Sequence, residues 1–174
     1  MGIQFETDYN METLTAMAKG LRKTVRKKRS RRVHIFAAVV LILGLLTILA
    51  TTAGGGPFGA SGIVTLLALL VLILATVFED RLNAWFARKR LLPGTEHAAA
   101  TFEEDGYVSA TSMSESKFSY AQIVAVAETA RYFVFALSSH HTQAYDKRTI
   151  RGGSVEDFRA FIAEKTGKLV EKIK

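Results

Sequence analysis

The stretch that decides the fold is residues 33–78, which read VHIFAAVVLILGLLTILATTAGGGPFGASGIVTLLALLVLILATVF. It contains no Asp, Glu, Lys or Arg. A core helix of a globular protein averages about 12 residues, whereas an apolar helix needs about 20 to cross the hydrocarbon of a bilayer. We therefore predict a membrane α-helical hairpin with spans at about 33–53 and 57–78. Gly54, Gly55 and Gly56 end the first helix, and Pro57 suits the first turn of the second.

Two other interpretations of this stretch fit less well. A cleaved signal peptide has a shorter apolar region that begins closer to the N-terminus. A helical hairpin buried in a soluble protein would need a polar face toward water, and neither predicted helix has one. The turn between the spans is short, so the two helices are predicted to be antiparallel neighbours.

The charges flanking the hairpin predict its orientation. Residues 1–32 hold nine basic and three acidic side chains, more basic residues follow the second span, and the turn between the spans has no charge. The positive-inside rule then places both termini in the cytoplasm of a bacterial cell, with the chain in its inner membrane. The predicted contacts with anionic headgroups at the membrane surface are Arg22, Arg26, Lys27, Lys28, Arg29, Arg31, Arg32, Trp85, Arg88, Lys89 and Arg90.

The basic run before the first span has a second interpretation, because clusters of Lys and Arg also bind nucleic acid. Its direct adjacency to an apolar span favours attraction to anionic lipid instead, at about 1 kcal/mol per basic residue near the surface. We therefore expect the lipid bilayer as a partner and no nucleic acid. Residues 79–92, which include Trp85 and Phe86, are predicted to form a basic, aromatic helix at the interface.

Residues 1–32 are predicted to form a strand followed by a basic amphipathic helix. Apolar and polar residues alternate from Ile3 to Tyr9, as in a half-buried strand, and Asn10 can cap a helix. We expect this helix to continue through the basic run into the first span. A lone strand needs a partner, and our hypothesis is that it pairs with an open edge of the C-terminal sheet.

Residues 93–174 are predicted to form a small cytoplasmic α+β domain with an antiparallel sheet. Asp105-Gly106 is a strong hairpin signal between two strands, and further strands are expected at 118–120, 123–128, 132–137 and 142–145. Ser154 and Asp157 favour the start of an amphipathic helix that closes the sheet. Its apolar stripe is Val155, Phe158, Ile162, Leu169 and Ile173, and Gly167 is expected to leave residues 168–174 frayed. A pleckstrin-homology-like shape is an analogy for this order of elements.

The order of strand, basic helix, two spans and small domain resembles the YcxB-like family of bacterial membrane proteins. Local patterns that resemble the family include Phe102–Tyr107 (FEEDGY), Tyr120–Ile123 (YAQI) and Lys147-Arg148 followed by Gly153 and the helix with Phe158. Ala144-Tyr145-Asp146 departs from the aliphatic pair and Pro that the family pattern would place before Lys147. The resemblance implies a fold but no chemistry.

No constellation of residues predicts an enzyme. The chain has no Cys, no G-x-S-x-G motif and no phosphate-binding lysine after its glycine run. His140 and His141 are adjacent on a predicted turn without a third ligand at a suitable spacing, so solvated turn residues fit better than a metal site. We predict no catalytic residue, no metal and no cofactor. Arg131, Lys147, Arg148 and Arg151 are candidate contacts for a headgroup or an acidic peptide, with a solvated face as the simpler interpretation.

These features favour a non-enzymatic, membrane-anchored interaction or regulatory module with a protein partner. The alternative is a small subunit of an oligomeric transporter or channel. Such proteins place polar or ionisable groups within the membrane, whereas the predicted spans offer mainly threonines. Self-association of the hairpin stays open, because the spans contain small residues but no G-x-x-x-G pair.

Overall fold

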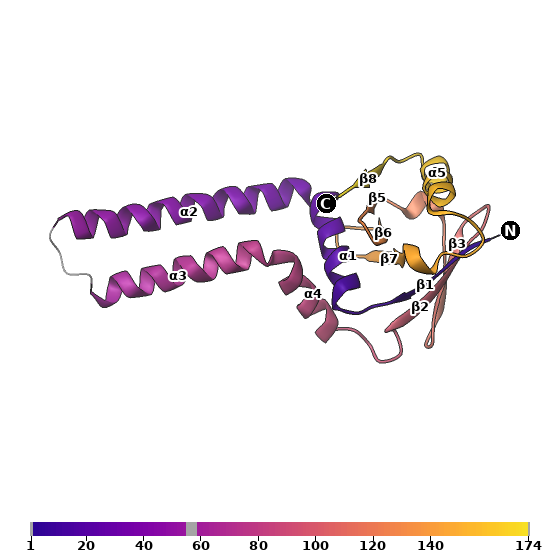
Figure 1. Cartoon of the computed structure of the whole chain (residues 1–174), viewed down its shortest axis with the longest axis horizontal. Helices are drawn as coiled ribbons and strands as arrows, with labels where there is room; N and C mark the ends of the chain where they lie inside the picture. Colours follow the sequence, from indigo (N-terminus) through magenta and orange to yellow (C-terminus); the bar gives the residue numbers. More distant parts are fainter. Residues whose placement is uncertain (1, 55–58, 174) are drawn as a thin grey trace.

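The computed structural model describes residues 2–54 and 59–173, and shows a long helical hairpin attached to a compact β domain (Figure 1). The hairpin consists of α2 (Lys27–Ala53) and α3 (Ala60–Val77). Both helices are long and apolar enough to cross a membrane, and few of their residues are buried. The predicted turn residues Gly55, Gly56 and Pro57 lie outside the described part of the chain.

The two helices of the hairpin pack closely, with a glycine of α2 against a leucine of α3. Ala37 of α2 and Leu69 of α3 are the buried residues of the described hairpin. A Cβ atom added at Gly44 would lie 2.7 Å from Cδ2 of Leu69, closer than side chains tolerate. Gly44 therefore lets the helices approach each other within one chain.

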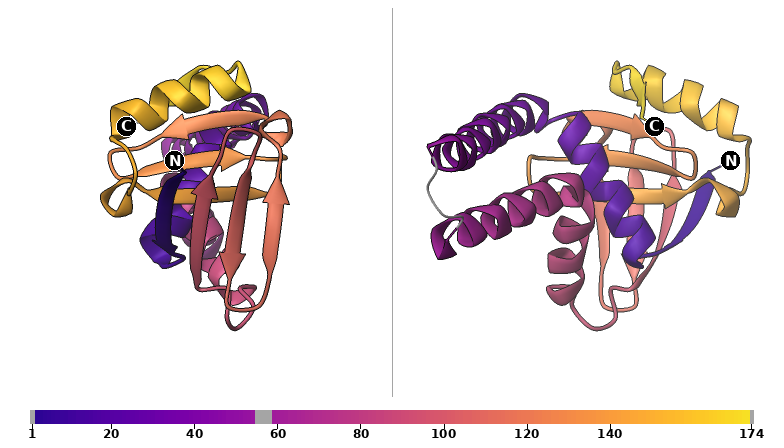
Figure 2. Two further views of the ribbon diagram at one scale, coloured as in Figure 1. Left: turned by 90° about the vertical axis from the view of Figure 1, so that its right-hand side faces the viewer. Right: turned by 60° about the vertical axis from the view of Figure 1, so that its left-hand side comes forward.

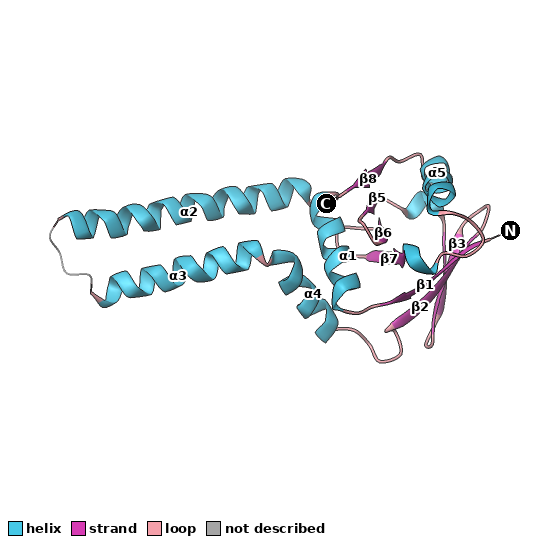
Figure 3. Ribbon diagram, viewed as in Figure 1, coloured by secondary structure: helices cyan, strands magenta, loops and turns pink. Residues whose placement is uncertain are grey.

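Within the described residues, eight strands and one α-helix form the β domain, and the strands make two four-stranded sheets. The strands are β1 (Ile3–Asp8), β2 (His97–Phe102), β3 (Tyr107–Thr111), β4 (Glu115–Phe118), β5 (Ala125–Glu128), β6 (Tyr132–Ala136), β7 (Thr142–Asp146) and β8 (Val170–Lys172), and the helix is α5 (Val155–Thr166). One sheet has the order β1-β2-β3-β4 and the other β7-β6-β5-β8. Figures 2 and 3 show that the strands of one sheet run across those of the other.

The N-terminal strand is an integral part of this domain, which confirms the hypothesis drawn from its alternating pattern. β1 pairs antiparallel with β2 along its whole length, from Ile3 opposite Phe102 to Asp8 opposite His97. Since alternate side chains point to opposite faces, Phe5 and Thr7 are buried. Residues before the hairpin and residues after it thus share one sheet.

An aromatic core lies between the two sheets. The ring of Phe5 packs 4.6 Å from that of Phe158 on α5 and 5.7 Å from that of Tyr145 on β7. Other buried members are Phe102, Tyr107, Tyr120, Ile123, Val126, Phe133, Phe135 and Ile162. The predicted apolar stripe on α5 is confirmed for Phe158 and Ile162, which are fully buried.

Two helices, α1 (Met11–Lys23) and α4 (Glu79–Lys89), join the domain to the hairpin. Asn10 caps α1 as predicted, its side chain accepting from the backbone N–H of Glu12 and Thr13. α1 packs on β6 so closely that a Cβ at Gly20 would lie 2.6 Å from Cγ1 of Val134. Figure 1 and the right view of Figure 2 show α1 between the hairpin and the second sheet.

The expectation of one continuous helix from Asn10 into the first span is wrong. α1 ends at Lys23 and α2 begins at Lys27, and α1 lies crosswise to α2 (Figure 1). The hydroxyl and the backbone N–H of Thr24 both donate to the carbonyl of Gly20. The side chain of Arg26 donates to the carbonyl of Ser139 at 2.6 Å, which fixes the bend against the β6–β7 turn.

The C-terminal tail also differs from the prediction. Gly167 ends α5 in the left-handed conformation as expected, but residues 170–172 form β8, parallel to β5, instead of fraying. The sheet is therefore not wholly antiparallel. Leu169 is 88% exposed and Ile173 follows β8, so neither extends the apolar stripe of α5.

Two strand boundaries shift for local reasons. The strand expected at 118–120 ends at Phe118, because Ser119 caps a short 3₁₀ turn over Tyr120–Gln122. The following strand begins at Ala125 and leaves Val124 half exposed.

Substitution of Gly20 tests the close packing of α1 on the domain. We expect Gly20→Leu to lower the free energy of unfolding by about 2 kcal/mol, because the stiff, buried Val134 must move to admit the new side chain. Denaturant unfolding of the full chain in mild detergent measures this. Lys23→Leu, on the exposed last turn of α1, should change it by less than about 0.5 kcal/mol. An unchanged or higher midpoint for Gly20→Leu would contradict the packing.

Candidate functional site

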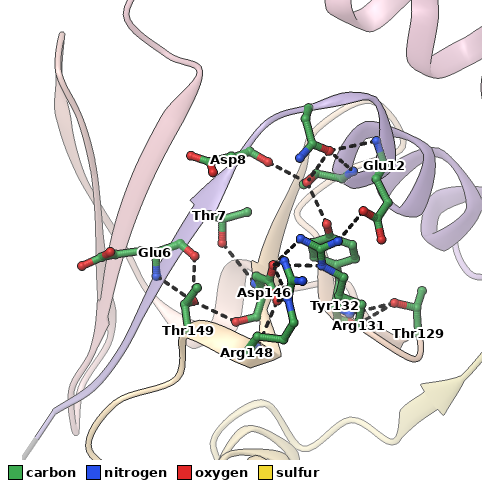
Figure 4. Close-up of polar contacts among 12 residues, drawn as sticks. Glu6, Thr7, Asp8, Glu12, Thr129, Arg131, Tyr132, Asp146, Arg148 and Thr149 are labelled. Carbon is green, nitrogen blue, oxygen red and sulfur yellow. Dashed lines mark hydrogen bonds and ion pairs between the residues drawn. The ribbon is translucent and has the colours of Figure 1, made fainter.

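The predicted headgroup or peptide contacts Arg131 and Arg148 meet at one buried carboxylate, Asp146, at the end of β7 (Figure 4). Asp146 is 5% exposed and accepts from the Arg131 side chain at 3.0 Å and from the Arg148 side chain at 2.9 Å. Arg131 also pairs with Glu12 on α1. Both guanidinium groups therefore have internal partners.

The same cluster connects the N-terminal segment to the rest of the domain. The backbone N–H of Asp146 donates to the hydroxyl of Thr7, and the Thr13 hydroxyl lies 3.2 Å from that of Tyr132. Thr149 donates through its hydroxyl to the carbonyl of Glu6 and accepts from the N–H of Glu6 (Figure 4). These contacts hold β1 and α1 against β6 and β7.

Lys147 belongs to a second cluster, around Glu128 at the end of β5. The Lys147 ammonium donates to Glu128 at 3.0 Å and to the carbonyl of Thr129 at 2.7 Å. Arg159 on α5 donates to both oxygens of Glu128, at 2.7 and 2.8 Å. The hydrogen bond from Arg159 and the contact with Lys147 lower the pKa of Glu128 to about 2, against the opposing effect of burial.

Arg151 lies apart from both clusters. Its backbone N–H and carbonyl form a bridge with Gln4 at the start of β1, and its exposed side chain lies 3.3 Å from Glu6. The four candidate contacts thus do not converge on one open site. Each has a carboxylate partner, and their common role in this structure is to join segments distant in the sequence.

The predicted membrane-surface residues divide into two groups. Arg22 and Arg26 are structural: Arg22 donates to both oxygens of Asp80 at 2.7 and 2.6 Å, linking α1 to α4, and Arg26 fixes the bend before α2. The hydrogen bond with Asp80 raises the pKa of Arg22. The remaining residues are exposed around the base of the hairpin: Lys27, Lys28, Arg29, Arg31, Arg32, Trp85, Arg88, Lys89 and Arg90.

The aromatic and cationic side chains of α4 also contact each other. The Lys89 ammonium lies 3.6 Å from the centre of the Trp85 ring, and the ring of Phe86 packs 5.0 Å from that of Trp85. The side chains of Lys89 and Trp85 each have an apolar body and a polar end, which is the combination favoured at headgroup depth.

Two grooves at the base of the hairpin were not predicted from the sequence. One, of about 920 Å³, lies between α1, the β5–β6 turn and the end of β8, and includes Lys19, Arg131 and Lys147. The other, of about 700 Å³, lies between α1, the start of α2, α4 and the β6–β7 turn. Its walls come from segments far apart in the sequence, so no local motif could have revealed it.

The histidine pair lines the second groove but shows no metal-binding geometry. Nδ1 of His140 lies 2.8 Å from the hydroxyl of Ser139. Within residues 2–54 and 59–173, no three His, Cys, Asp or Glu side chains come together as metal ligands.

The fold defines a class of protein: a small β domain, completed by an N-terminal strand, that carries an apolar helical hairpin with a cationic base. Residues 102–162 match the family model of YcxB-like protein, so this part of the chain is similar to that family. The match confirms the resemblance for the stretch from β2 to α5. Searches of curated proteins and of solved structures found no match.

Proposed function

We propose that this chain is a non-enzymatic, membrane-anchored interaction or regulatory module of a bacterial inner membrane. The observation that carries the proposal is the exposed apolar surface of α2 and α3. The aromatic core of the domain forms without these helices, whose large side chains such as Phe36, Leu49 and Val64 stay exposed. Such surface is stable in lipid and unfavourable in water.

The pairing of β1 with β2 supports a topology with both termini on one side of the membrane. Asp8, before the hairpin, is the register partner of His97, after it. A pairing of this kind requires both flanks of the hairpin to lie on one side. The exposed cations of the same region favour the cytoplasm as that side under the positive-inside rule.

We further propose that the domain is pleckstrin-homology-like, with α5 closing one end of its two sheets. Phe158 and Ile162 of α5 lie in the aromatic core, and the strands of the two sheets cross (Figure 2). In this arrangement the loops and exposed strand edges are free to bind a protein partner at the membrane surface.

The transporter or channel alternative receives less support from the polar side chains of the hairpin. The hydroxyls of Thr47, Thr51, Thr52, Thr65 and Thr76 each donate to a carbonyl of their own helix. They are therefore already hydrogen-bonded without a partner helix or a water-filled path.

Fractionation of membranes tests the proposed anchoring. After ultracentrifugation without detergent and an alkaline wash, the full chain should stay in the membrane pellet. Recovery in the supernatant would overturn the proposal.

Crosslinking in native membranes then separates the two functions. A heterologous adduct is expected for an interaction module, and a discrete ladder of homo-oligomers would favour the transport subunit instead.

A further inference from the structure

The groove between α1, α2, α4 and the β6–β7 turn combines an apolar wall with uncommitted cations. Its volume is about 700 Å³, and its apolar side chains include Leu14, Met17, Val33 and Phe86. Val33 is the first residue of the uncharged stretch, so this groove opens where the apolar hairpin begins. One groove thus adjoins both the exposed apolar helix and the domain.

The cations of this groove differ in what they already bind. Arg22 is held by Asp80, and Arg26 by the carbonyl of Ser139. Glu79, the acidic residue of the lining, lies 3.8 Å from Arg22 and 3.6 Å from His34. Within the described ranges 2–54 and 59–173, Arg29 and Arg90 form no ion pair with any residue of the chain, and both are exposed in the groove.

We propose that this groove binds the headgroup of an anionic phospholipid, which deepens the proposed function and rests on it. Arg29 from α2 and Arg90 from α4 would donate to the headgroup phosphate, as guanidinium groups do well. The glycerol region and the first part of the acyl chains would lie against Val33 and Phe86 and continue along the exposed face of α2.

The larger groove on the other side of α1 is the weaker candidate for the same ligand. Its cations Arg131 and Lys147 are already paired with Glu12 and Glu128. An anion there would have to compete with carboxylates at ion-pair distance from both cations. In the smaller groove the carboxylate, Glu79, lies near Arg22 and His34, and no described carboxylate lies at ion-pair distance from Arg29 or Arg90.

Native mass spectrometry of the full chain in mild detergent, with added phospholipid, tests the proposal. The wild-type protein should retain phosphatidylglycerol about 30-fold better than phosphatidylcholine, because two basic residues near the headgroup contribute about 1 kcal/mol each. The double variant Arg29→Gln, Arg90→Gln should lose most of this preference.

The matched control is Arg31→Gln with Arg88→Gln, which removes the same charge from the exposed base of the hairpin outside the groove. It should keep the preference within about twofold. An equal loss in both double variants would overturn the site in favour of non-specific attraction. Inorganic phosphate displacing the lipid at equal concentration would also overturn it, because a lipid site uses the apolar wall.

The outcomes distinguish this inference from the proposed function. A chain that stays in the membrane pellet but shows no preference for phosphatidylglycerol refutes the groove alone. A chain that leaves the pellet refutes the membrane anchoring on which the groove depends. Since the side chains of Arg29 and Arg90 form no ion pair with the residues that the structure describes, both double variants should unfold at the wild-type denaturant concentration.

Discussion

Phe5→Ala should destabilise the protein by about 3–5 kcal/mol, although Phe5 precedes the hairpin and most of the domain follows it. Phe5 is 1% exposed and its ring packs against those of Phe102, Phe133, Tyr145 and Phe158. Its truncation leaves a cavity at the centre of the aromatic core. Denaturant unfolding of the full chain in mild detergent measures the loss.

Leu169→Ala is the control for this experiment, because Leu169 is 88% exposed. It should change the free energy of unfolding by less than about 0.5 kcal/mol. Equal stability of Phe5→Ala and the wild-type protein would show that the strand at 3–8 does not belong to the core. A variant lacking residues 2–9 should fail to fold for the same reason.

Glu128→Ala should lower the free energy of unfolding by a comparable amount, about 3–5 kcal/mol. The loss comes from removing a charged partner and not from leaving a cavity. Glu128 is 5% exposed and is the common partner of Lys147 and Arg159. Its removal leaves two partly buried cations without their carboxylate, which is the costly way to break an ion pair. Glu156→Ala, which removes an exposed carboxylate 3.6 Å from Arg159, should cost less than about 1 kcal/mol. A loss of similar size in both variants would contradict the central role of Glu128.

The pH dependence of stability gives an independent test of Glu128. Its pKa is lowered from 4.5 to about 2 in the folded chain, so folding favours the charged form. Its stabilisation, roughly 3 kcal/mol from this shift, is fully present above about pH 5 and is lost as the pH falls toward 2. In the Glu128→Ala variant this part of the acid dependence should disappear. If the stability of the variant and of the wild type fell identically with decreasing pH, the proposed contribution of Glu128 would be refuted.

Sequence patterns predicted those parts of the fold that depend on local periodicity. The uncharged stretch predicted two apolar helices, the alternation from Ile3 to Tyr9 predicted β1, and Asp105-Gly106 predicted the hairpin turn between β2 and β3. The helices and β1 repeat a pattern with the period of their element, and the Asp-Gly pair is a local turn signal, so none of these predictions needs knowledge of distant contacts.

Other elements could not be predicted from local patterns because tertiary contacts determine where they form. β8 is a three-residue strand in a charged tail, and its parallel pairing with β5 and the packing of Val170 and Ile173 on the core order it. The break between α1 and α2 depends on the contact of Arg26 with Ser139, far along the chain. Propensity favoured a continuous helix, and these contacts overrode it.

The candidate site also combines features that the sequence predicts with features that only tertiary contacts determine. The sequence identified the cations at the base of the hairpin, but not which of them are already paired. Arg22 binds Asp80, 58 positions away, while Arg29 is left uncommitted within the described residues. Only the fold brings α2, α4 and the β6–β7 turn together, and so only the fold reveals the groove.

We propose a hairpin that crosses the membrane with the whole domain on the cytoplasmic side. Because the chain has no Cys, single substitutions report accessibility to a membrane-impermeant maleimide in bacterial spheroplasts. We expect Gly59→Cys, at the start of α3, to react in intact spheroplasts, and Ser116→Cys, on exposed β4, to react only after permeabilisation. Reaction of Ser116→Cys in intact spheroplasts, to the extent seen after permeabilisation, would contradict a cytoplasmic location of the domain.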